Sequence, residues 1–252
     1  MGEPTQTRHP FLEWPGPIAF AHRGGGGEAP ENTMPAFQHA VDLGYAYLET
    51  DVRVSADGIA IAFHDEDLHR TCGRPERISD LPWRELATMR VHDAEPIAKL
   101  EDVFGTWPEV RINVDCKDSA SLEPLAAMVE RFGALDRTLV GSFDDRRVRW
   151  LRWRLGRRAC TTAGIGEVSA LRFTGWAPPG ADAAQIPLRR YGISVATSSF
   201  VRRAHARRLA VHVWTINEAD EIHRLLDLGA DGIMTDHPTV LKDVLQQRGM
   251  WF

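Results

Sequence analysis

The sequence contains little cysteine. Three cysteines occur in 252 residues, Cys72, Cys116 and Cys160, and no pair of them has the spacing of metal ligands. Neither a disulfide framework nor a cysteine metal site is therefore expected. The chain also shows no basic segment followed by an apolar run at its start, and no run near the roughly 18 apolar residues that span a bilayer. We expect a cytoplasmic protein with reduced thiols.

An excess of positive charge is missing as well. The 30 Lys and Arg residues against 35 Asp and Glu residues give a formal net charge of −5. Because contacts to nucleic-acid phosphates need net or clustered positive charge, no nucleic-acid partner is expected. Hydrophobic residues make up 43% and charged residues 26% of the chain, which is typical of a globular protein and excludes intrinsic disorder.

Short β-branched runs alternate with amphipathic helical stretches along most of the chain. Residues 1–16 carry three prolines and no periodicity, so they are interpreted as a lead-in segment, and residues 17–252 as one domain. The candidate strands are Ile18–His22, Tyr47–Val54, Ile59–His64, Arg111–Cys116, Thr138–Phe143, Ala159–Ala163, Ala184–Pro187, Val211–Thr215 and Gly232–Thr235. The alternation predicts βαβ units and a parallel sheet.

Nine candidate strands are one too many for an eight-stranded barrel. The second and third are joined through Asp57-Gly58, a strong two-residue hairpin signal, so Ile59–His64 is predicted to return antiparallel. The remaining eight strands predict a single-domain α/β fold, a (β/α)₈ TIM barrel of the usual length of about 250 residues, with a β-hairpin excursion after the second strand. In this register Ala56 faces Ile59 and His64 lies across from Asp51, at the C-terminal rim where barrel enzymes place their chemistry.

Polar residues follow the first predicted strand. His22 and Arg23 precede four glycines; a guanidinium fits a phosphate, and glycines let the backbone run close to a ligand. A flexible turn is the alternative. Asn32 or Thr33 is a candidate helix N-cap, and capping alone would explain both residues. Capping does not explain the presence of Glu31 beside them.

Acidic residues mark two further strands. Glu49 and Asp51 project to one face, and Asp115 and Lys117 share a face of a middle strand. Oxygen ligands favour Mg²⁺, Ca²⁺ or Mn²⁺ over zinc. A solvated pair of edge-strand acids and a self-neutralising Asp115–Lys117 pair are the alternatives. Trp214, near the end of a later strand, is a candidate apolar wall of the site or a packing residue.

Taken together, several segments resemble the glycerophosphodiester phosphodiesterase family, a family of TIM barrels. The resemblance extends from about His22 to Pro238 and rests on AHRGGGGEAPENTMPAF, YLETDVRVSADGIAIAFHDEDLHRT, INVDCK, VGSF, VHVWTIN and GIMTDHP. It implies an enzyme that hydrolyses glycerophosphodiesters to sn-glycerol 3-phosphate and an alcohol with one divalent metal ion, Mg²⁺, Ca²⁺ or Mn²⁺.

The resemblance also implies roles for individual residues. His22 and His64 match the two catalytic histidines, and Glu49 and Asp51 match two metal ligands. Asp115 stands where the family usually has a glutamate as third ligand, so this chain differs there by one methylene.

Three more positions match residues of the family's site. The resemblance implies that Arg23 and Lys117 contact phosphate and that Glu31 supports the site. Because imidazole has an unperturbed pKa of about 6.5, histidine suits both proton transfers, with His22 provisionally the base and His64 the acid. Direct attack by water and prior attack by the glycerol 2-hydroxyl, which gives a cyclic phosphate, both stay open.

Other functions are weighed beside this one. A lysophospholipase D acting on lipid-bearing diesters is the second enzyme hypothesis, and a non-catalytic phosphodiester-binding barrel is a third. A zinc amidohydrolase is disfavoured because no H-x-H pair follows the first strand.

A basic stretch follows the VGSF segment. Two tryptophans, Trp150 and Trp153, accompany its seven arginines, Arg146, Arg147, Arg149, Arg152, Arg154, Arg157 and Arg158. A basic amphipathic helix can lie on anionic lipid, and a solvated outer helix of the barrel is the alternative. No oligomeric state is indicated.

Overall fold

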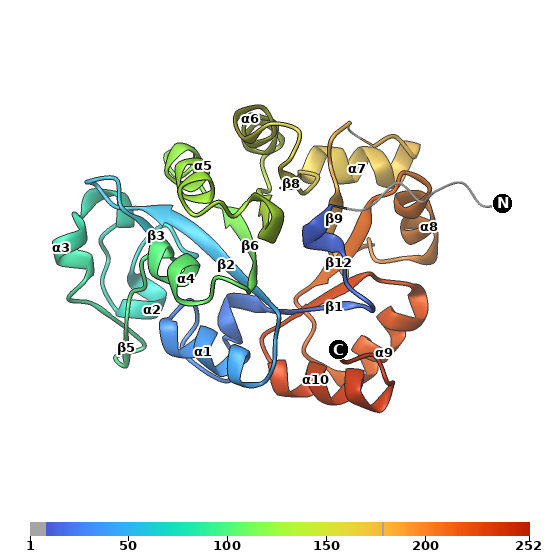
Figure 1. Ribbon diagram of the computed structural model, residues 1–252, viewed down its shortest axis with the longest axis horizontal. Helices are drawn as coiled ribbons and strands as arrows, with labels where there is room; N and C mark the ends of the chain where they lie inside the picture. Colours follow the sequence, from blue (N-terminus) through green and yellow to red (C-terminus); the bar gives the residue numbers. More distant parts are fainter. Residues whose placement is uncertain (1–8, 178) are drawn as a thin grey trace.

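Eight parallel strands form the centre of the molecule (Figure 1). The computed structural model describes residues 9–177 and 179–252. The barrel strands are β1 (Ile18–Ala21), β2 (Tyr47–Val54), β6 (Arg111–Cys116), β7 (Thr138–Gly141), β8 (Cys160–Thr161), β9 (Ala183–Pro187), β12 (Ala210–Trp214) and β13 (Gly232–Thr235). They are ordered β8-β7-β6-β2-β1-β13-β12-β9, and a parallel bridge from Thr162 to Ala183 closes the ring between β8 and β9.

Each barrel strand is followed by a helix on the outside of the ring. These helices are α1 (Met34–Asp42), α4 (Leu100–Thr106), α5 (Leu122–Arg131), α6 (Asp145–Leu155), α7 (Ile165–Thr174), α8 (Ser198–Ala206), α9 (Ala219–Leu228) and α10 (Pro238–Gln247). The predicted (β/α)₈ barrel is therefore confirmed. Within the described residues, no helix has both the length and the apolar character needed to cross a membrane.

Three strands have the bounds that the sequence predicts, namely β2, β6 and β13. Among the barrel strands, the largest difference is in the strand predicted at Ala159–Ala163, which pairs as a strand only over Cys160–Thr161 in β8. Strands of a parallel barrel are covered on both faces, so their apolar runs are nearly continuous, as the fully buried IAFA of β1 shows.

The floor of the barrel is an aromatic cluster. Phe11, in the short helix η1 (Pro10–Leu12), is fully buried; its ring centroid lies 5.3 Å from that of Tyr47 and 6.3 Å from that of Phe20. The Tyr47 hydroxyl donates to the Phe11 carbonyl at 2.8 Å. Residues 9–16 of the predicted lead-in thus pack against the strands, whereas residues 1–8 lie outside the described residues.

The loop of the predicted hairpin has three residues instead of two. The strand β3 (Ala60–Ala62) pairs antiparallel with β2 as predicted, but Ile59 lies opposite Ser55 and not opposite Ala56. The Ser55 amide donates to the Ile59 carbonyl at 3.0 Å. Gly58 has φ of 84°, and a turn followed by a left-handed glycine is the usual three-residue loop.

This one-residue shift corrects the predicted pairing at the site. Phe63, and not His64, lies opposite Asp51, and its amide donates to the Asp51 carbonyl at 3.1 Å. His64 follows β3 in an irregular segment and reaches the rim from there.

The excursion after β2 has a small core of its own. Its further elements are α2 (His69–Cys72), η3 (Ile78–Asp80), α3 (Trp83–Leu86), β4 (Arg90–Val91) and β5 (Glu95–Pro96). Buried Ile61, Leu68 and Leu86 belong to a cluster separate from the main core. A second hairpin, β10 (Arg189–Arg190) with β11 (Ile193–Ser194), projects from the β9–α8 connection outside the barrel sheet.

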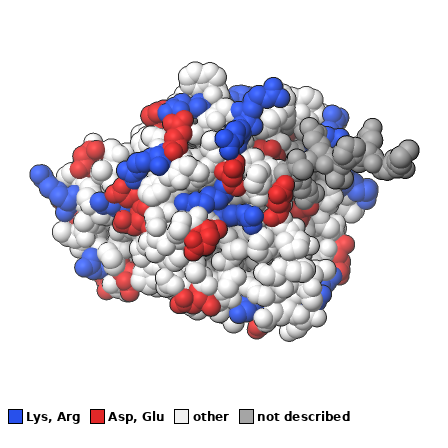
Figure 2. Space-filling model, in the orientation of Figure 1, with Lys and Arg blue, Asp and Glu red and all other residues white. Residues whose placement is uncertain are grey.

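The basic stretch that the sequence shows at 146–158 forms α6 and the turn after it. Three of its seven arginines form ion pairs with acids on neighbouring elements: Arg152 with Glu167, Arg154 with Glu123 and Glu130, and Arg158 with Asp136. On the face in Figure 2, basic and acidic side chains are accordingly interspersed.

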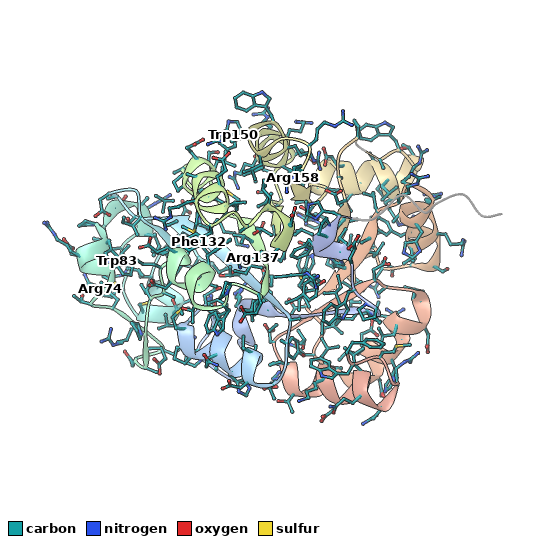
Figure 3. The ribbon with its side chains drawn as sticks, in the orientation of Figure 1. Arg74, Trp83, Phe132, Arg137, Trp150 and Arg158 are labelled. Atoms are coloured by element: carbon teal, nitrogen blue, oxygen red, sulfur yellow. The ribbon has the colours of Figure 1, made fainter. Side chains whose placement is uncertain are left out.

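One arginine closes the end of a helix at the base of the barrel. Arg137 of η4 (Leu135–Arg137) donates to the carbonyls of Phe104 and Val110 at 2.8 and 3.0 Å, near the end of α4 (Figure 3). Carbonyls at a helix C-terminus lack intrahelical donors, so this contact satisfies them.

The aromatic floor makes a stability prediction. Phe11→Ala should lower the free energy of unfolding by about 3 kcal/mol, because a buried phenyl ring is replaced by a cavity. Urea denaturation would measure the change. Trp153→Ala, at a side chain that is 76% exposed, is the matched control and should change it by less than about 0.5 kcal/mol. Equal effects of the two substitutions would contradict the packing described for residues 9–16.

Candidate active site

The predicted site residues come together at the C-terminal ends of the strands. A cavity of about 420 Å³ opens there. Eight of the nine predicted site residues line this cavity: His22, Arg23, Glu49, Asp51, His64, Asp115, Lys117 and Trp214. The ninth predicted residue, Glu31, does not line the cavity but contacts a residue that does: it accepts a hydrogen bond from the Arg23 guanidinium at 3.0 Å.

A buried cluster of opposite charges forms the base of the cavity. The register of β2 and β6 places Asp51 beside Asp115. The Lys117 ammonium bridges them, at 2.7 Å from Asp51 Oδ1 and 2.6 Å from Asp115 Oδ2. Arg23 Nε lies 3.1 Å from Asp51 Oδ2. Burial alone would raise the pKa of Asp51, but Lys117 and Arg23 hold it well below the usual range.

Glu49 is compensated less completely. Its side chain is buried and accepts from the Arg23 backbone amide at 3.1 Å. Burial raises the pKa of Glu49 to about 7, because the attraction of His22 offsets only part of the cost and the Asp51 charge adds to it. A buried carboxyl with this pKa near other charges is typical of functional sites.

The turn after β1 fixes Arg23 over these acids. Arg23 has φ of 54°, a left-handed conformation that is costly for a residue with a side chain and occurs at functional sites. Gly24 and Gly25 follow with φ of 80° and 95°. A Cβ on Gly24 would lie 2.8 Å from the backbone of Ala36, and one on Gly25 would lie 2.7 Å from Pro238. These two glycines therefore bring the turn close to α1 and α10.

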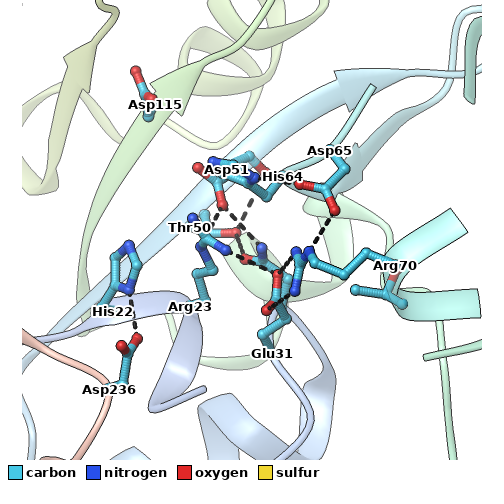
Figure 4. A network of polar contacts seen from close by, with 12 residues as sticks. His22, Arg23, Glu31, Thr50, Asp51, His64, Asp65, Arg70, Asp115 and Asp236 are labelled. Atoms are coloured by element: carbon cyan, nitrogen blue, oxygen red, sulfur yellow. Dashed lines mark hydrogen bonds and ion pairs between the residues drawn. The ribbon is translucent and has the colours of Figure 1, made fainter. Parts of the chain in front are cut away.

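Each histidine is oriented by a carboxylate. His22 Nδ1 lies 2.7 Å from Asp236 Oδ1, and His64 Nδ1 lies 2.6 Å from Asp65 Oδ1 (Figure 4). A carboxylate on Nδ1 fixes the ring and its tautomer, which leaves Nε2 for the reacting group. His22 Nε2 lies 3.8 Å from Glu49 Oε2.

The two histidines differ in their electrostatic surroundings. Burial would lower the pKa of His22, but Glu49 and Asp236 outweigh it, so that the pKa is raised. Burial lowers the pKa of His64, and Asp51 offsets this only in part. In the chain without a cation the proton therefore resides preferentially on His22. The predicted order, with His22 as base and His64 as acid, stays a prediction.

An outer network joins the two sides of the site (Figure 4). Arg70 of α2 donates to both oxygens of Glu31 at 2.7 Å and to Asp65 Oδ2 at 2.6 Å. Glu31 binds Arg23 in turn, and Asp65 holds His64. Arg70 thus links Arg23, through Glu31, to His64, through Asp65.

Several of these partners were missed by sequence reasoning. Asp65 and Asp236 were visible in FHDED and TDHP, but their contacts with histidine could not be derived from spacing. Thr33 is the N-cap of α1, as one of the two predictions has it. Asn32 instead donates to Asp51 Oδ2 at 3.0 Å and accepts from the Thr50 hydroxyl.

The three candidate carboxylates have the chemistry that a hard divalent cation requires. Glu49, Asp51 and Asp115 offer only oxygen, and the charge of Glu49 is only partly compensated by this chain's own cations. As placed, however, no three acidic, histidine or cysteine side chains of the described residues are grouped closely enough to hold an ion. The Lys117 ammonium lies between two of the three candidate ligands.

The arrangement defines a class of protein. Arginine and lysine at one end of a cavity suit the charge of a phosphate, and two oriented imidazoles suit proton transfer to and from oxygen. With the (β/α)₈ barrel, this combination is that of a barrel hydrolase for phosphate diesters.

Comparison with known proteins is consistent with this class. The model of the glycerophosphoryl diester phosphodiesterase family matches residues 22–240. A Mycobacterium tuberculosis protein named probable glycerophosphodiester phosphodiesterase 2 is 39% identical, covering 96% of this chain and 95% of its own. Human lysophospholipase D GDPD1 is 30% identical, covering 90% and 85%. The chain belongs to the glycerophosphoryl diester phosphodiesterase family, whose members are phosphodiester hydrolases.

Solved structures share the fold. A crystal structure of glycerophosphodiester phosphodiesterase from Agrobacterium tumefaciens has a TM-score of 0.75 at 21% identity, covering 90% of this chain and 99% of that one. An Oleispira antarctica phosphodiesterase in complex with the product sn-glycerol-3-phosphate has a TM-score of 0.76 at 22% identity, covering 91% and 97%.

The raised pKa of Glu49 makes a prediction about stability. The unfolded chain has the ordinary glutamate pKa of 4.5 and the folded chain one of about 7, so the folded wild type loses stability as pH rises through this interval. With a chelator present, Glu49→Gln should therefore be more stable than the wild type at about pH 8, by on the order of 2 kcal/mol, and equal to it at about pH 4.

Urea denaturation at the two pH values would measure this difference. Glu85→Gln, at an exposed position in α3, is the control and should show no such dependence. A difference between Glu49→Gln and wild type that does not change with pH would contradict the assignment.

Proposed function

We propose that this enzyme is a metal-dependent phosphodiesterase that hydrolyses glycerophosphodiesters to sn-glycerol 3-phosphate and an alcohol, with His22 and His64 as the acid/base pair. One observation carries the proposal. Two histidines, each oriented by a carboxylate, line the same cavity as a buried cluster of acidic and basic side chains. The names of the relatives, and the product bound to the Oleispira antarctica protein, support the same substrate class.

The chain's own cations would hold the phosphate. Arg23 is fixed by its turn and by Glu31, so that its guanidinium is positioned before substrate arrives. Lys117 has a flexible stem, and its ammonium would leave Asp115 and turn to a non-bridging phosphate oxygen. Positive charge at these positions stabilises the negative charge that develops on the phosphoryl oxygens.

Glu49, Asp51 and Asp115 would hold the divalent ion, Mg²⁺, Ca²⁺ or Mn²⁺. Such an ion supplies further charge stabilisation at the phosphoryl group when bound. The departure of Lys117 from Asp51 and Asp115 would free the carboxylate oxygens for it.

The histidines would move the protons. One imidazole takes the proton of the attacking hydroxyl as the new P–O bond forms, and the other gives a proton to the alcohol oxygen as the old P–O bond breaks. Asp236 and Asp65 hold the two rings in place through Nδ1 and stabilise the imidazolium that forms.

A second candidate function is hydrolysis of lysophospholipids. Much of the cavity beyond the charged end is apolar, with Phe143, Ile165, Val168 and Phe173 among its lining residues. Such a wall suits a hydrocarbon chain, and one of the relatives is named lysophospholipase D. Contact of the basic stretch 146–158 with anionic lipid also stays a prediction, in which Arg146, Arg149, Arg157 and Arg158 are the exposed members.

The first experiment measures hydrolysis. Release of glycerol 3-phosphate from glycerophosphocholine and glycerophosphoethanolamine, and of lysophosphatidic acid from lysophosphatidylcholine, would be followed with Mg²⁺, Ca²⁺, Mn²⁺ or EDTA. His64→Ala should lower kcat by about a hundredfold or more, because it removes a general acid or base.

His69→Ala, at an exposed histidine five residues further on, is the matched control and should retain activity. Faster cleavage of lysophosphatidylcholine than of the short diesters would favour the second candidate. Full activity in EDTA, or in His64→Ala, would contradict the proposed mechanism.

Metal binding has its own readout. Saturating Mg²⁺ or Ca²⁺ should raise the melting temperature of the wild type, since an ion at about a hundred times its Kd adds about 2.7 kcal/mol of stability. Asp115→Asn should lose this increase, and Asp80→Asn, at an exposed aspartate, should keep it. An increase of the same size in Asp115→Asn would exclude Asp115 as a ligand.

A further inference from the structure

Large hydrophobic side chains are exposed around the mouth of the cavity. Among the described residues, seven such side chains are exposed, and four of them line the cavity: Phe143, Phe173, Tyr191 and Ile193. These four are called the rim below. Scattered exposed apolar residues are ordinary, but a group around one opening indicates an interaction surface.

The rim adjoins the catalytic cluster. The Lys117 ammonium lies 5.5 Å from the centroid of the Phe143 ring, and the Trp214 ring packs edge-on against Phe143 at 5.4 Å. Whatever covers the rim therefore also covers the entrance used by substrate.

The β10–β11 hairpin carries the most prominent part of the rim. Tyr191 and Gly192 form its turn with φ of 49° and 78°, the left-handed pair of a type I′ turn. This turn places the Tyr191 side chain outward, where it is 89% exposed, with Ile193 beside it at 49%. Within the part of the chain that the structure describes, the two strands of the hairpin pair with each other and not with the barrel sheet.

Basic charge accompanies the rim. Between residues 168 and 197, the segment that contains the hairpin and Phe173, the chain has one acidic residue, Asp182, and three arginines, although the whole chain has a net charge of −5. Arg190 lies 5.2 Å from the centroid of the Tyr191 ring, and Arg172 lies 5.7 Å from that of Phe173. With Arg189 on the hairpin, these arginines form no ion pair with any of the described residues.

We infer that the rim docks the enzyme on an anionic phospholipid surface, with the cavity mouth turned to the headgroups. Aromatic rings with a polar neighbour sit favourably at a membrane interface, and unpaired arginines attract anionic headgroups. The occupant follows from charge, because an apolar rim with Arg172, Arg189 and Arg190 beside it, on an acidic protein, is complementary to such a surface. This docking is independent of the proposed reaction.

Vesicle flotation tests the inference without any hydrolysis. The full chain would be mixed with vesicles of phosphatidylcholine alone or of an equimolar mixture with phosphatidylglycerol. We expect the wild type to float with the mixed vesicles only, and to lose binding as salt screens the charges. The double variant Tyr191→Ser/Ile193→Ser should bind about tenfold more weakly, because it removes the apolar tip.

Two further variants separate the rim from α6. Arg189→Gln/Arg190→Gln should also weaken binding to the mixed vesicles. Trp153→Ser, at an exposed tryptophan of α6, is the matched control and should bind as the wild type does. Circular dichroism melting of every variant checks that it is folded.

Three results would overturn the inference. The first is that the wild type does not float with either kind of vesicle. The second is that Trp153→Ser loses binding while the hairpin variants keep it. The third is that light scattering shows a dimer that the rim substitutions abolish, without any vesicle binding. The last would mean that a second copy of the chain covers the rim.

Discussion

The burial of acidic side chains at the top of the barrel is the constraint on which the site depends. An isolated carboxylate out of water is costly, and it persists only when cations or donors compensate it. Lys117 and Arg23 meet this requirement at Asp51, each from a different neighbouring strand end. The parallel register of β2 and β6 sets the spacing of the acids, so the chemistry is fixed by sheet hydrogen bonds and not by loops alone.

Closure of the ring has a functional role as well as a structural one. Asp236 follows the last strand and His22 follows the first, and they meet because β13 pairs with β1. The other histidine is oriented locally, by its neighbour Asp65. The placement of His22 therefore depends on the joining of the two ends of the barrel, and that of His64 depends on the excursion.

Much of the fold and of the candidate site could be predicted from the sequence. Apolar runs indicate the strands, and the polar residues at the strand ends indicate the site. The bounds of β2, β6 and β13, the hairpin and the meeting of eight of the nine predicted site residues were accessible in that way. The hairpin register was not, since Asp57-Gly58 fits both a two-residue turn and a three-residue loop ending in a left-handed glycine. Arg70 was missed for another reason: its partners Glu31 and Asp65 come from different loops, and their proximity is tertiary.

The aromatic cluster at the floor of the barrel supports the residues of the candidate site above it. Along β2, Tyr47, Glu49 and Asp51 alternate with residues of the opposite face, so the ring that closes the base and the two acids stand in successive layers of one strand. Phe11 holds the lowest layer through the Tyr47 hydroxyl. A shortened protein that begins at β1 would thus keep every residue of the candidate site and still lose the support beneath them. The choice of the first residue in any engineered version is therefore also a choice about the geometry of that site.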